Sequence, residues 1–188
     1  MNKKLKVKRT DNNIIEVNMK ILNSSYIEKI MRLQDEIVEG LEDKQLYAST
    51  EKDEFMKYID SEGIILGVTT EEDELIAMGV YVAKGYDKKN YGYDLGIIDE
   101  ELLRVGQIES TVVKIEFRGN RLQKVICEEL EKIAREKENT ILTSTASPYN
   151  KFSVNTFLDL GYEIKVEKVK YGGLKRYVMM KKLSQPNK

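Results

Sequence analysis

An arginine–glycine turn directly precedes a predicted amphipathic helix in the second half of the chain. Residues 112–123 read VVKIEFRGNRLQ, so a short apolar run ends, Arg118 and Gly119 follow, and the helix begins at about Leu122. Such a turn directs the unpaired backbone N–H groups from Gly119 to Gln123, and the positive end of the helix dipole, toward one point. This arrangement can bind a pyrophosphate without a metal ion, although a glycine before a helix can also be a plain turn.

The turn differs from the two common glycine-rich phosphate motifs. It has neither the second glycine nor the Gly-Lys-Ser/Thr ending of a P-loop, and it has no G-x-G-x-x-G dinucleotide fingerprint. The sequence therefore indicates a short anion-binding turn of another kind.

A second group of residues strengthens this interpretation. It follows Gln123 by 27 residues, with one predicted strand between, and consists of Asn150, Ser153, Phe157, Gly161 and Tyr162. Each has a local explanation, since Asn150 can cap a helix and Gly161 can end one. Both groups in this order favour one shared ligand site over two unrelated turns.

Composition excludes several classes of function. With 188 residues the chain is long enough for one domain with a proper core, here taken as residues 1–188 with a core over about 14–183. A net charge of −1 argues against nucleic acid or anionic membrane as the main partner. No stretch approaches the roughly 20 apolar residues of a membrane span, and no apolar run follows the charged N-terminus, so we expect a cytoplasmic protein.

The inventory of reactive side chains is short. There is no histidine, which removes the usual general base and, with a single cysteine, predicts no metal site. Cys127 falls on the apolar side of a predicted helix, where a core thiol is favoured over a reactive one. Carboxylates and tyrosines therefore have to carry any acid–base chemistry.

Alternating periodicities predict the elements that would position these residues. The ends, 1–4 and 184–188, are expected to fray, and the acidic run Glu71–Glu74 is expected to be a solvated hairpin tip. Gly85 to Gly92 belong to a glycine- and tyrosine-rich connection that either lines a pocket or is a plain surface excursion. We expect a strand over 15–21, helices opened by Ser24-Ser25 and Ser49-Thr50, a hairpin of 64–68 and 75–82, a connection over 84–98, helical turns over 99–105, a strand over 109–115, a helix over 122–134, a strand over 140–145, a helix over 151–160, and strands over 162–169 and 176–183.

The two groups resemble the motifs of the GNAT superfamily of acetyltransferases. Residues 117–123, FRGNRLQ, are similar to its acyl-CoA motif, Arg/Gln-x-x-Gly-x-Gly/Ala, with Arg121 where glycine is commonest and Gln123 where glycine or alanine is usual. Residues 150–162 are similar to its later motif, Asn-x-x-Ala/Ser-x-x-x-Tyr-x-x-x-Gly-Phe/Tyr. The resemblance is specific over about 109–162, and the nearest likeness is to uncharacterised bacterial GNAT proteins.

This resemblance implies an α/β fold with a mixed central sheet of about six to seven strands flanked by about four helices, the turn following the fourth strand. It implies acetyl-CoA as cosubstrate and transfer of its acetyl group to a primary amine by direct attack. The cofactor-binding residues would be Val112, Val113, Arg118, Gly119, Asn120, Arg121, Leu122, Gln123, Asn150 and Ser153. The partners would be acetyl-CoA and a small-molecule or peptide amine, in a monomer or a homodimer.

The catalytic residues are less determined by the resemblance. Glu109, expected near the start of its strand, is the candidate base, with a plain salt bridge as the alternative. Phe157 stands where many GNAT enzymes have a proton-donating tyrosine; Tyr149 is a candidate in its place, with packing as the alternative. A catalytically inactive CoA-binding or regulatory domain of the same fold remains open, as does an interaction module without a ligand. The acceptor would be chosen by the junction Leu46-Tyr47, the loop before the fourth strand and the last hairpin.

Overall fold

One mixed sheet of eight strands organises the protein, in a computed structural model that describes residues 2–184. The strands lie in the order β1-β2-β3-β4-β5-β6-β8-β7, and every neighbouring pair is antiparallel except β5 and β6. Their bounds are β1 Asn2–Lys8, β2 Ile14–Ile21, β3 Gly63–Thr69, β4 Leu75–Val82, β5 Val105–Val113, β6 Ile141–Ala146, β7 Glu163–Lys170 and β8 Leu174–Lys182.

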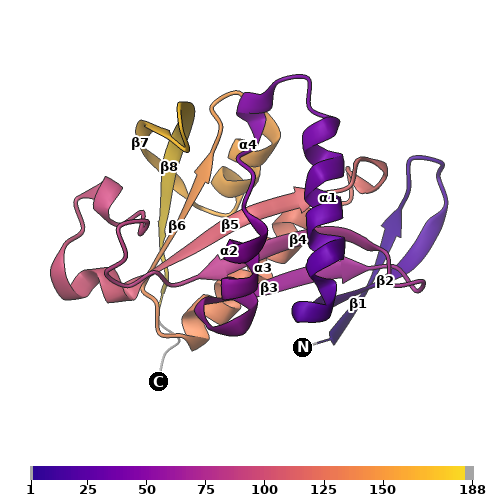
Figure 1. The fold of residues 1–188 in the computed structure, drawn as a ribbon, viewed down its shortest axis with the longest axis horizontal. Coiled ribbons are helices and arrows are strands. Elements are labelled where there is room, and N and C mark those ends of the chain that lie inside the picture. The colour runs from indigo at the N-terminus through magenta and orange to yellow at the C-terminus, as the bar shows by residue number, and fades with distance from the viewer. Residues whose placement is uncertain (1, 185–188) are drawn as a thin grey trace.

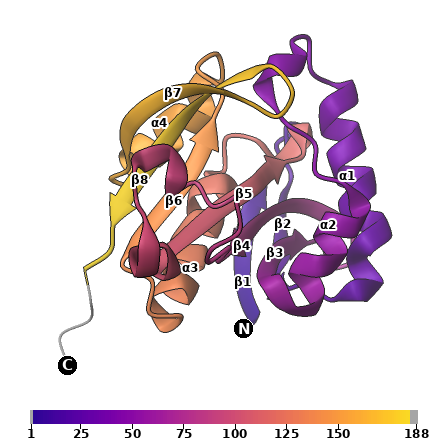
Figure 2. The ribbon, with the colours of Figure 1, turned by 60° about the vertical axis from the view of Figure 1, so that its left-hand side comes forward.

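Helices cover both faces of this sheet (Figures 1 and 2). The α-helices are α1 Ile27–Glu39, α2 Lys52–Lys57, α3 Leu122–Glu136 and α4 Lys151–Asp159, and a π-helical turn, Tyr58–Glu62, extends α2. Helices α1 and α2 pack against one face, where Ile65 and Met78 are buried. Helices α3 and α4 pack against the other face, where Leu66 and Ala77 are buried. Alternate strand residues thus supply two cores, as the pleat requires. None of the described helices has the length and apolar composition needed to cross a bilayer.

The mixed α/β class expected from the sequence is confirmed, but the strand count is eight rather than six or seven. The prediction of a frayed N-terminus is wrong, because Asn2–Lys8 pairs with β2 along its whole length and buries Val7. Four of its seven residues are lysines, with Lys3 directly before Lys4, and these charges hid the alternation of Leu5 and Val7. The turn at Gly119 consequently follows the fifth strand. At the other end, residues 185–188 lie outside the described part of the chain.

Several element boundaries also differ from the expected ones. Asn23, not Ser24 or Ser25, accepts the capping hydrogen bond before α1, through its side chain and the Ser25 N–H. The second helix begins at Lys52 without a side-chain cap, so Ser49-Thr50 does not open it. The strand expected from residue 109 starts at Val105, because the apolar run of its first residues is buried in the sheet. Glu109 therefore lies in the middle of β5, not near its start.

Candidate cofactor and acceptor site

Strands β5 and β6 separate along their length. Their parallel pairing runs only from Val105 opposite Ile141 to Ile108 opposite Ser144. Beyond Ser144, β6 stays paired with β8, while the second half of β5 continues along β4 (Figure 1). On the side facing β6, the backbone from Glu109 onward therefore has no strand partner among the described residues. A cleft of about 1100 Å³ opens at this point.

A β-bulge turns the backbone of β5 into this cleft. Val80 of β4 pairs with Glu109 and Met78 pairs with Val112, so β5 carries one more residue than β4 between these pairs. Ser110 adopts a positive φ of 49° there, and its hydroxyl lies 2.8 Å from that of Thr50. Bulges re-aim side chains and expose backbone groups, and this one places Glu109 to Val113 along the cleft wall.

The turn before α3 forms the adjoining end of the cleft. Gly119 has φ +86° and Arg121 has φ +56°, and α3 begins at Leu122. Within residues 2–184, no backbone or side-chain acceptor receives a hydrogen bond from the N–H groups of residues 119–124. These amides, at the N-terminus of a long helix, have the unpaired arrangement that the sequence predicted for this turn, and such an arrangement suits an anion.

The side chain of Asn120 fixes the turn to β1. Its Oδ1 accepts from the Lys8 N–H at 2.8 Å, and its Nδ2 donates to the Lys8 and Phe117 carbonyls at 2.7 and 2.9 Å. Asn120 is thus engaged by the protein itself and does not line the cleft. Its contribution to a bound anion would come from its backbone N–H.

Arg121 occupies the left-handed backbone conformation that explains why glycine is common at this position. Its side chain is exposed and lines the cleft. A non-glycine residue with this backbone costs roughly 1–2 kcal/mol.

Arg121→Gly is therefore expected to raise the free energy of unfolding by about 1 kcal/mol in the absence of ligand, after allowing for glycine's extra freedom in the unfolded chain. Arg118→Gly is the matched control, because Arg118 has φ −65° and gains no strain relief. Urea denaturation of both variants measures the difference. Equal destabilisation by both changes would contradict the assignment of strain to Arg121.

The start of helix α4 lines the cleft next to the turn. Asn150 caps the helix, since its Oδ1 accepts from the Ser153 N–H at 3.1 Å, and its side chain also lines the cleft. Gln123 donates from Nε2 to the hydroxyls of Thr111 (2.9 Å) and Ser153 (3.2 Å). Gln123 thereby bridges β5 and α4, a role that the usual small residue could not perform.

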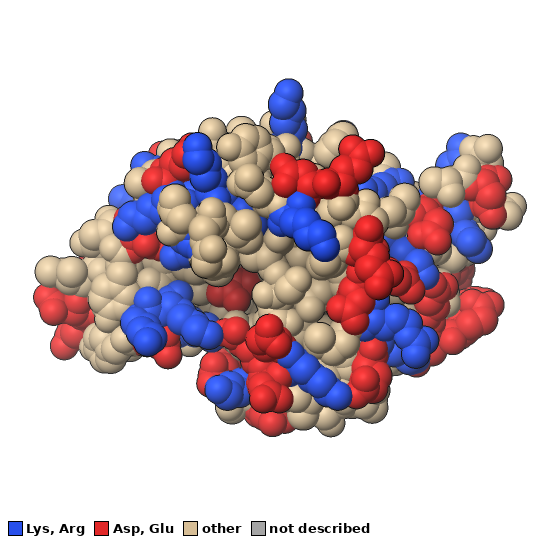
Figure 3. All heavy atoms as spheres, turned by 45° about the horizontal axis from the view of Figure 1, so that its top comes forward, with Lys and Arg blue, Asp and Glu red and all other residues tan. Residues whose placement is uncertain are grey.

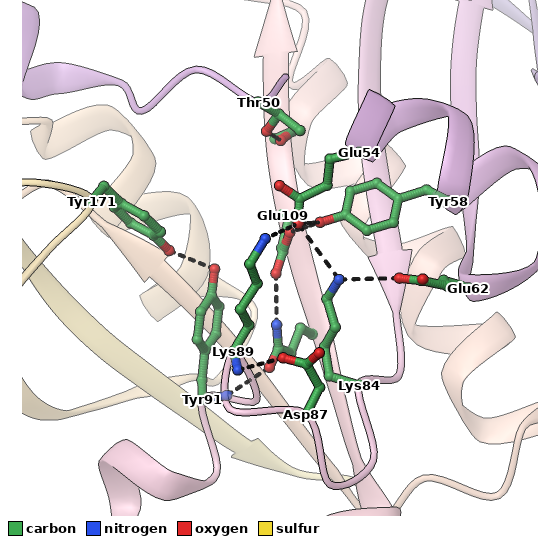
Figure 4. A network of polar contacts seen from close by, with 12 residues as sticks. Thr50, Glu54, Tyr58, Glu62, Lys84, Asp87, Lys89, Tyr91, Glu109 and Tyr171 are labelled. Carbon is green, nitrogen blue, oxygen red and sulfur yellow. Dashed lines mark hydrogen bonds and ion pairs between the residues drawn. The ribbon is translucent and has the colours of Figure 1, made fainter. Parts of the chain in front are cut away.

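A network of carboxylates surrounds Glu109 on the other side of the bulge (Figure 4). Glu109 accepts hydrogen bonds from Gln107 Nε2 at 2.6 Å and from the Tyr58 hydroxyl at 2.9 Å. The same Tyr58 hydroxyl lies 2.8 Å from Glu54 Oε1, which also accepts from Lys89 Nζ at 2.8 Å. Both glutamates line the cleft, so two carboxylates share one phenol beside the free strand edge.

The ionisation of this network follows from its surroundings. Burial, reinforced by the negative charges of Glu109 and Glu54, raises the pKa of Tyr58 far above its usual range, so the phenol stays protonated. Burial also acts to raise the pKa of Glu54, but hydrogen bonds from Lys89 and Tyr58 outweigh it and leave that pKa below its usual value. On the face drawn in Figure 3, Lys and Arg side chains are interspersed with Asp and Glu, and acidic atoms lie at the floor of a hollow.

No protein-family model matches this sequence, and no curated protein sequence matches it. The fold, however, is shared with solved structures. The acetyltransferase of GNAT family from Streptococcus pneumoniae superposes with a TM-score of 0.67 at 15% identity, covering 89% of this chain and 99% of that one. The chain has the GNAT fold.

Two further structures with this fold were solved with acetyl-CoA or coenzyme A bound. YncA, a putative acetyltransferase from Salmonella typhimurium solved with its cofactor acetyl-CoA, has a TM-score of 0.66 at 12% identity, with 92% of this chain and 96% of that one covered. PaiA N-acetyltransferase from Thermoplasma acidophilum, solved with coenzyme A, has a TM-score of 0.61 at 14% identity, with 89% and 99% covered.

Within the GNAT fold of this protein, Tyr149 does not reach the cleft. It is half exposed, and it is not among the residues that line the cavity. Tyr91 and Tyr171 do line it; their hydroxyls lie 2.5 Å apart, and Tyr171 also contacts the Thr145 hydroxyl at 3.0 Å. Tyr91 lies in the connection before β5 and Tyr171 in the last hairpin, two of the segments that the resemblance named as choosing the acceptor.

Phe157 belongs to the core and not to the cleft. It is 1% exposed and packs edge-to-face against Tyr162 at a centroid distance of 5.1 Å. A hydroxyl added here would be buried in a packed interior.

Phe157→Tyr is therefore expected to lower the free energy of unfolding by about 1–3 kcal/mol. It should not increase any acetyl-transfer rate, although it restores the residue type usual at this position. Phe152→Tyr is the control, because Phe152 is 89% exposed and the change there should be neutral. Thermal unfolding of the two variants provides the comparison, and a neutral Phe157→Tyr would show that this part of the core is loosely packed.

Proposed function

We propose that this protein is a GNAT-superfamily N-acetyltransferase that transfers the acetyl group of acetyl-CoA to a primary amine. The observation that carries the proposal is the meeting of three features in one cleft: unpartnered amides at the start of α3, a free edge of β5, and the carboxylate of Glu109, all within the described residues 2–184. The reaction requires a site for the diphosphate, a site for the pantetheine arm and a base, and each feature can supply one of these. Acyl carriers bound to proteins of the same fold add support.

The residues of the turn fit the diphosphate of coenzyme A. The backbone N–H groups from Gly119 to Gln123 would donate to its oxygens, and the helix dipole favours the negative charge. Arg118 and Arg121, both exposed on the cleft rim, would add charge-assisted contacts. We assign the diphosphate to this end of the cleft for these reasons.

The free edge of β5 fits the pantetheine arm. Its two amides can pair with backbone groups near Val112 and Val113 as an added strand would. On the opposite wall, Asn150 and Ser153 line the cleft and would contact the same arm. Held in this way, the thioester would lie beside the bulge, where a backbone N–H can stabilise the oxyanion of the tetrahedral intermediate.

Glu109 would act as the general base. It removes a proton from the acceptor ammonium, directly or through water, and the neutral nitrogen attacks the thioester carbonyl. A C–N bond forms, the C–S bond breaks, and the products are the acetylated amine and the thiol of coenzyme A after the thiolate takes a proton. Tyr171 at the cleft and solvent water are both able to supply that proton.

A second function is favoured by one observation. Phe157 occupies the usual tyrosine position and is buried, so the catalytic acid of many GNAT enzymes has no counterpart there. A CoA-binding regulatory domain of the same fold needs no such acid. It would bind coenzyme A without transferring its acyl group.

A thiol-release assay with acetyl-CoA and a panel of primary amines separates these functions. Amine-dependent release, with an acetylated product seen by mass spectrometry, is the result expected of the enzyme. Heat on titration with coenzyme A but no release with any amine would support the regulatory domain. No heat with coenzyme A would reject both.

A further inference from the structure

Arg176 of β8 is a buried cation in the wall of the cleft. The residue is 3% exposed, yet it lines the same cavity as Glu109. Its Nη1 donates to the carbonyls of Gln45 (2.8 Å) and Lys175 (2.7 Å). Within residues 2–184, its Nη2 has no hydrogen-bond partner and no carboxylate forms an ion pair with the side chain. The guanidinium is thus held by two neutral carbonyls.

Such an arrangement is uncommon because a buried charge without a counter-charge is strongly unfavourable. Burial lowers the pKa of Arg176, which shows the direction of the penalty, although guanidinium remains charged in proteins. Lys170, which lines the same cavity, already has a counter-charge, since its Nζ lies 2.5 Å from a carboxylate oxygen of Asp94. An incoming anion would therefore gain more interaction energy at Arg176 than at Lys170.

A chain of contacts connects Arg176 to the proposed base. The guanidinium carbon lies 5.8 Å from the centroid of the Tyr171 ring, and the Tyr171 hydroxyl meets that of Tyr91. The Tyr91 N–H donates to Gln107, which in turn donates to Glu109. Figure 4 shows the two tyrosines across from Glu109 and Glu54. The tyrosine pair therefore stands between a cationic and an anionic part of one cavity.

We propose that the acceptor is an amine that also carries a carboxylate, and that Arg176 binds this carboxylate. This inference rests on the acetyltransferase function proposed above and names its substrate class as amino acids, free or at the end of a larger molecule. The ammonium of such a molecule would face Glu109, and its carboxylate would face Arg176. The carboxylate would accept from the unpartnered Nη2 and replace the Gln45 carbonyl at Nη1, since a bidentate pair with a carboxylate is stronger than a single hydrogen bond to a neutral carbonyl.

Matched pairs of acceptors test the proposal. Each pair consists of an amino acid and its primary amide, and ω-amino acids of four to six carbons are included because their amines keep nearly the same pKa in the amide. The readout is kcat/KM for thiol release with saturating acetyl-CoA. The wild type is expected to prefer the acid by about 10- to 100-fold in at least one pair.

Arg176→Gln should abolish this preference by lowering the rate with the acid while leaving the rate with the amide unchanged. Arg176→Lys should keep part of the preference, and Lys175→Gln, at an exposed neighbouring position, should keep all of it. Equal rates for acid and amide in the wild type, or an equal loss of both in Arg176→Gln, would overturn the proposal. Amine-dependent release with no acid preference leaves the acetyltransferase function standing, whereas no release with any amine rejects that function instead.

A second measurement needs no variant and so does not depend on the folding of Arg176→Gln. Pentanoate is expected to inhibit competitively against the preferred acceptor, and pentanamide is not. Equal inhibition by the two would count against an anion site at Arg176.

Discussion

Glu109→Gln is expected to lower kcat for acetyl transfer by about 10²–10⁴-fold, the usual contribution of a general base. The substitution keeps the shape of the side chain and allows its contacts to be made again. The new amide oxygen can accept from Gln107, and the new amide nitrogen can donate to the Tyr58 oxygen, whose proton then goes to Glu54. The loss would therefore report the missing base and not a collapsed network.

Steady-state kinetics measure this effect, and calorimetry with coenzyme A provides the necessary comparison. Affinity for coenzyme A should stay within about twofold of the wild-type value, because Glu109 lies away from the amides of the turn. Glu101→Gln, at an exposed position outside the cleft, is the matched control and should change neither quantity. An unchanged kcat in Glu109→Gln would remove the base assignment.

Gly119→Val is expected to weaken coenzyme A binding by about 10- to 100-fold. At φ +86° a β-branched residue is strained, and the turn would relax away from the geometry that aligns its amides. A Cβ added at this glycine would meet no atom of residues 2–184 within 4 Å, so steric overlap with the protein is not the cause. Loss of one or two charge-assisted hydrogen bonds to the diphosphate accounts for the magnitude.

Gly96→Val is a close control for this change. Gly96 also has a positive φ, 73°, and a Cβ added there would likewise have no described atom within 4 Å, but this glycine lies outside the cleft. The substitution should cost similar stability and leave the affinity intact. The defect of Gly119→Val should disappear for pantetheine, which lacks the diphosphate; an equal defect for pantetheine would place the effect elsewhere.

The features that local sequence determines were predictable. The turn at Gly119 and helix α3 follow from a glycine and an apolar period within a few residues of each other, and Asn150 with Ser153 follows from capping. The pair Gln107 and Glu109 also had a local signal, since residues two apart share one face of a strand. The sequence analysis missed this pair because it began the strand at residue 109, four residues after its observed start at Val105.

The features that long-range contacts determine were not predictable. Tyr58 meets Glu109 across 51 positions, and Arg176 meets Gln45 across 131. The sequence pattern of one segment carries no information about the other, because each pair meets only when a helical turn packs against a strand of the folded sheet. The bulge at Ser110 was also not predictable, because no residue type near this serine marks its positive φ, which depends on the pairing of β5 with β4.

The single hydroxyl of Tyr58 between two carboxylates has a consequence for how the site returns to its starting state. When Glu109 holds a proton, it can donate to the phenol oxygen while the phenol donates to Glu54, with no heavy atom moving. The excess hydrogen is thereby relayed to Glu54 beside Lys89, whose side chain is 58% exposed. Rates in mixtures of light and heavy water should then show more than one hydrogen in motion. Glu109, as the proposed base, would then lose its extra proton through Tyr58 before the acetylated product leaves the cavity.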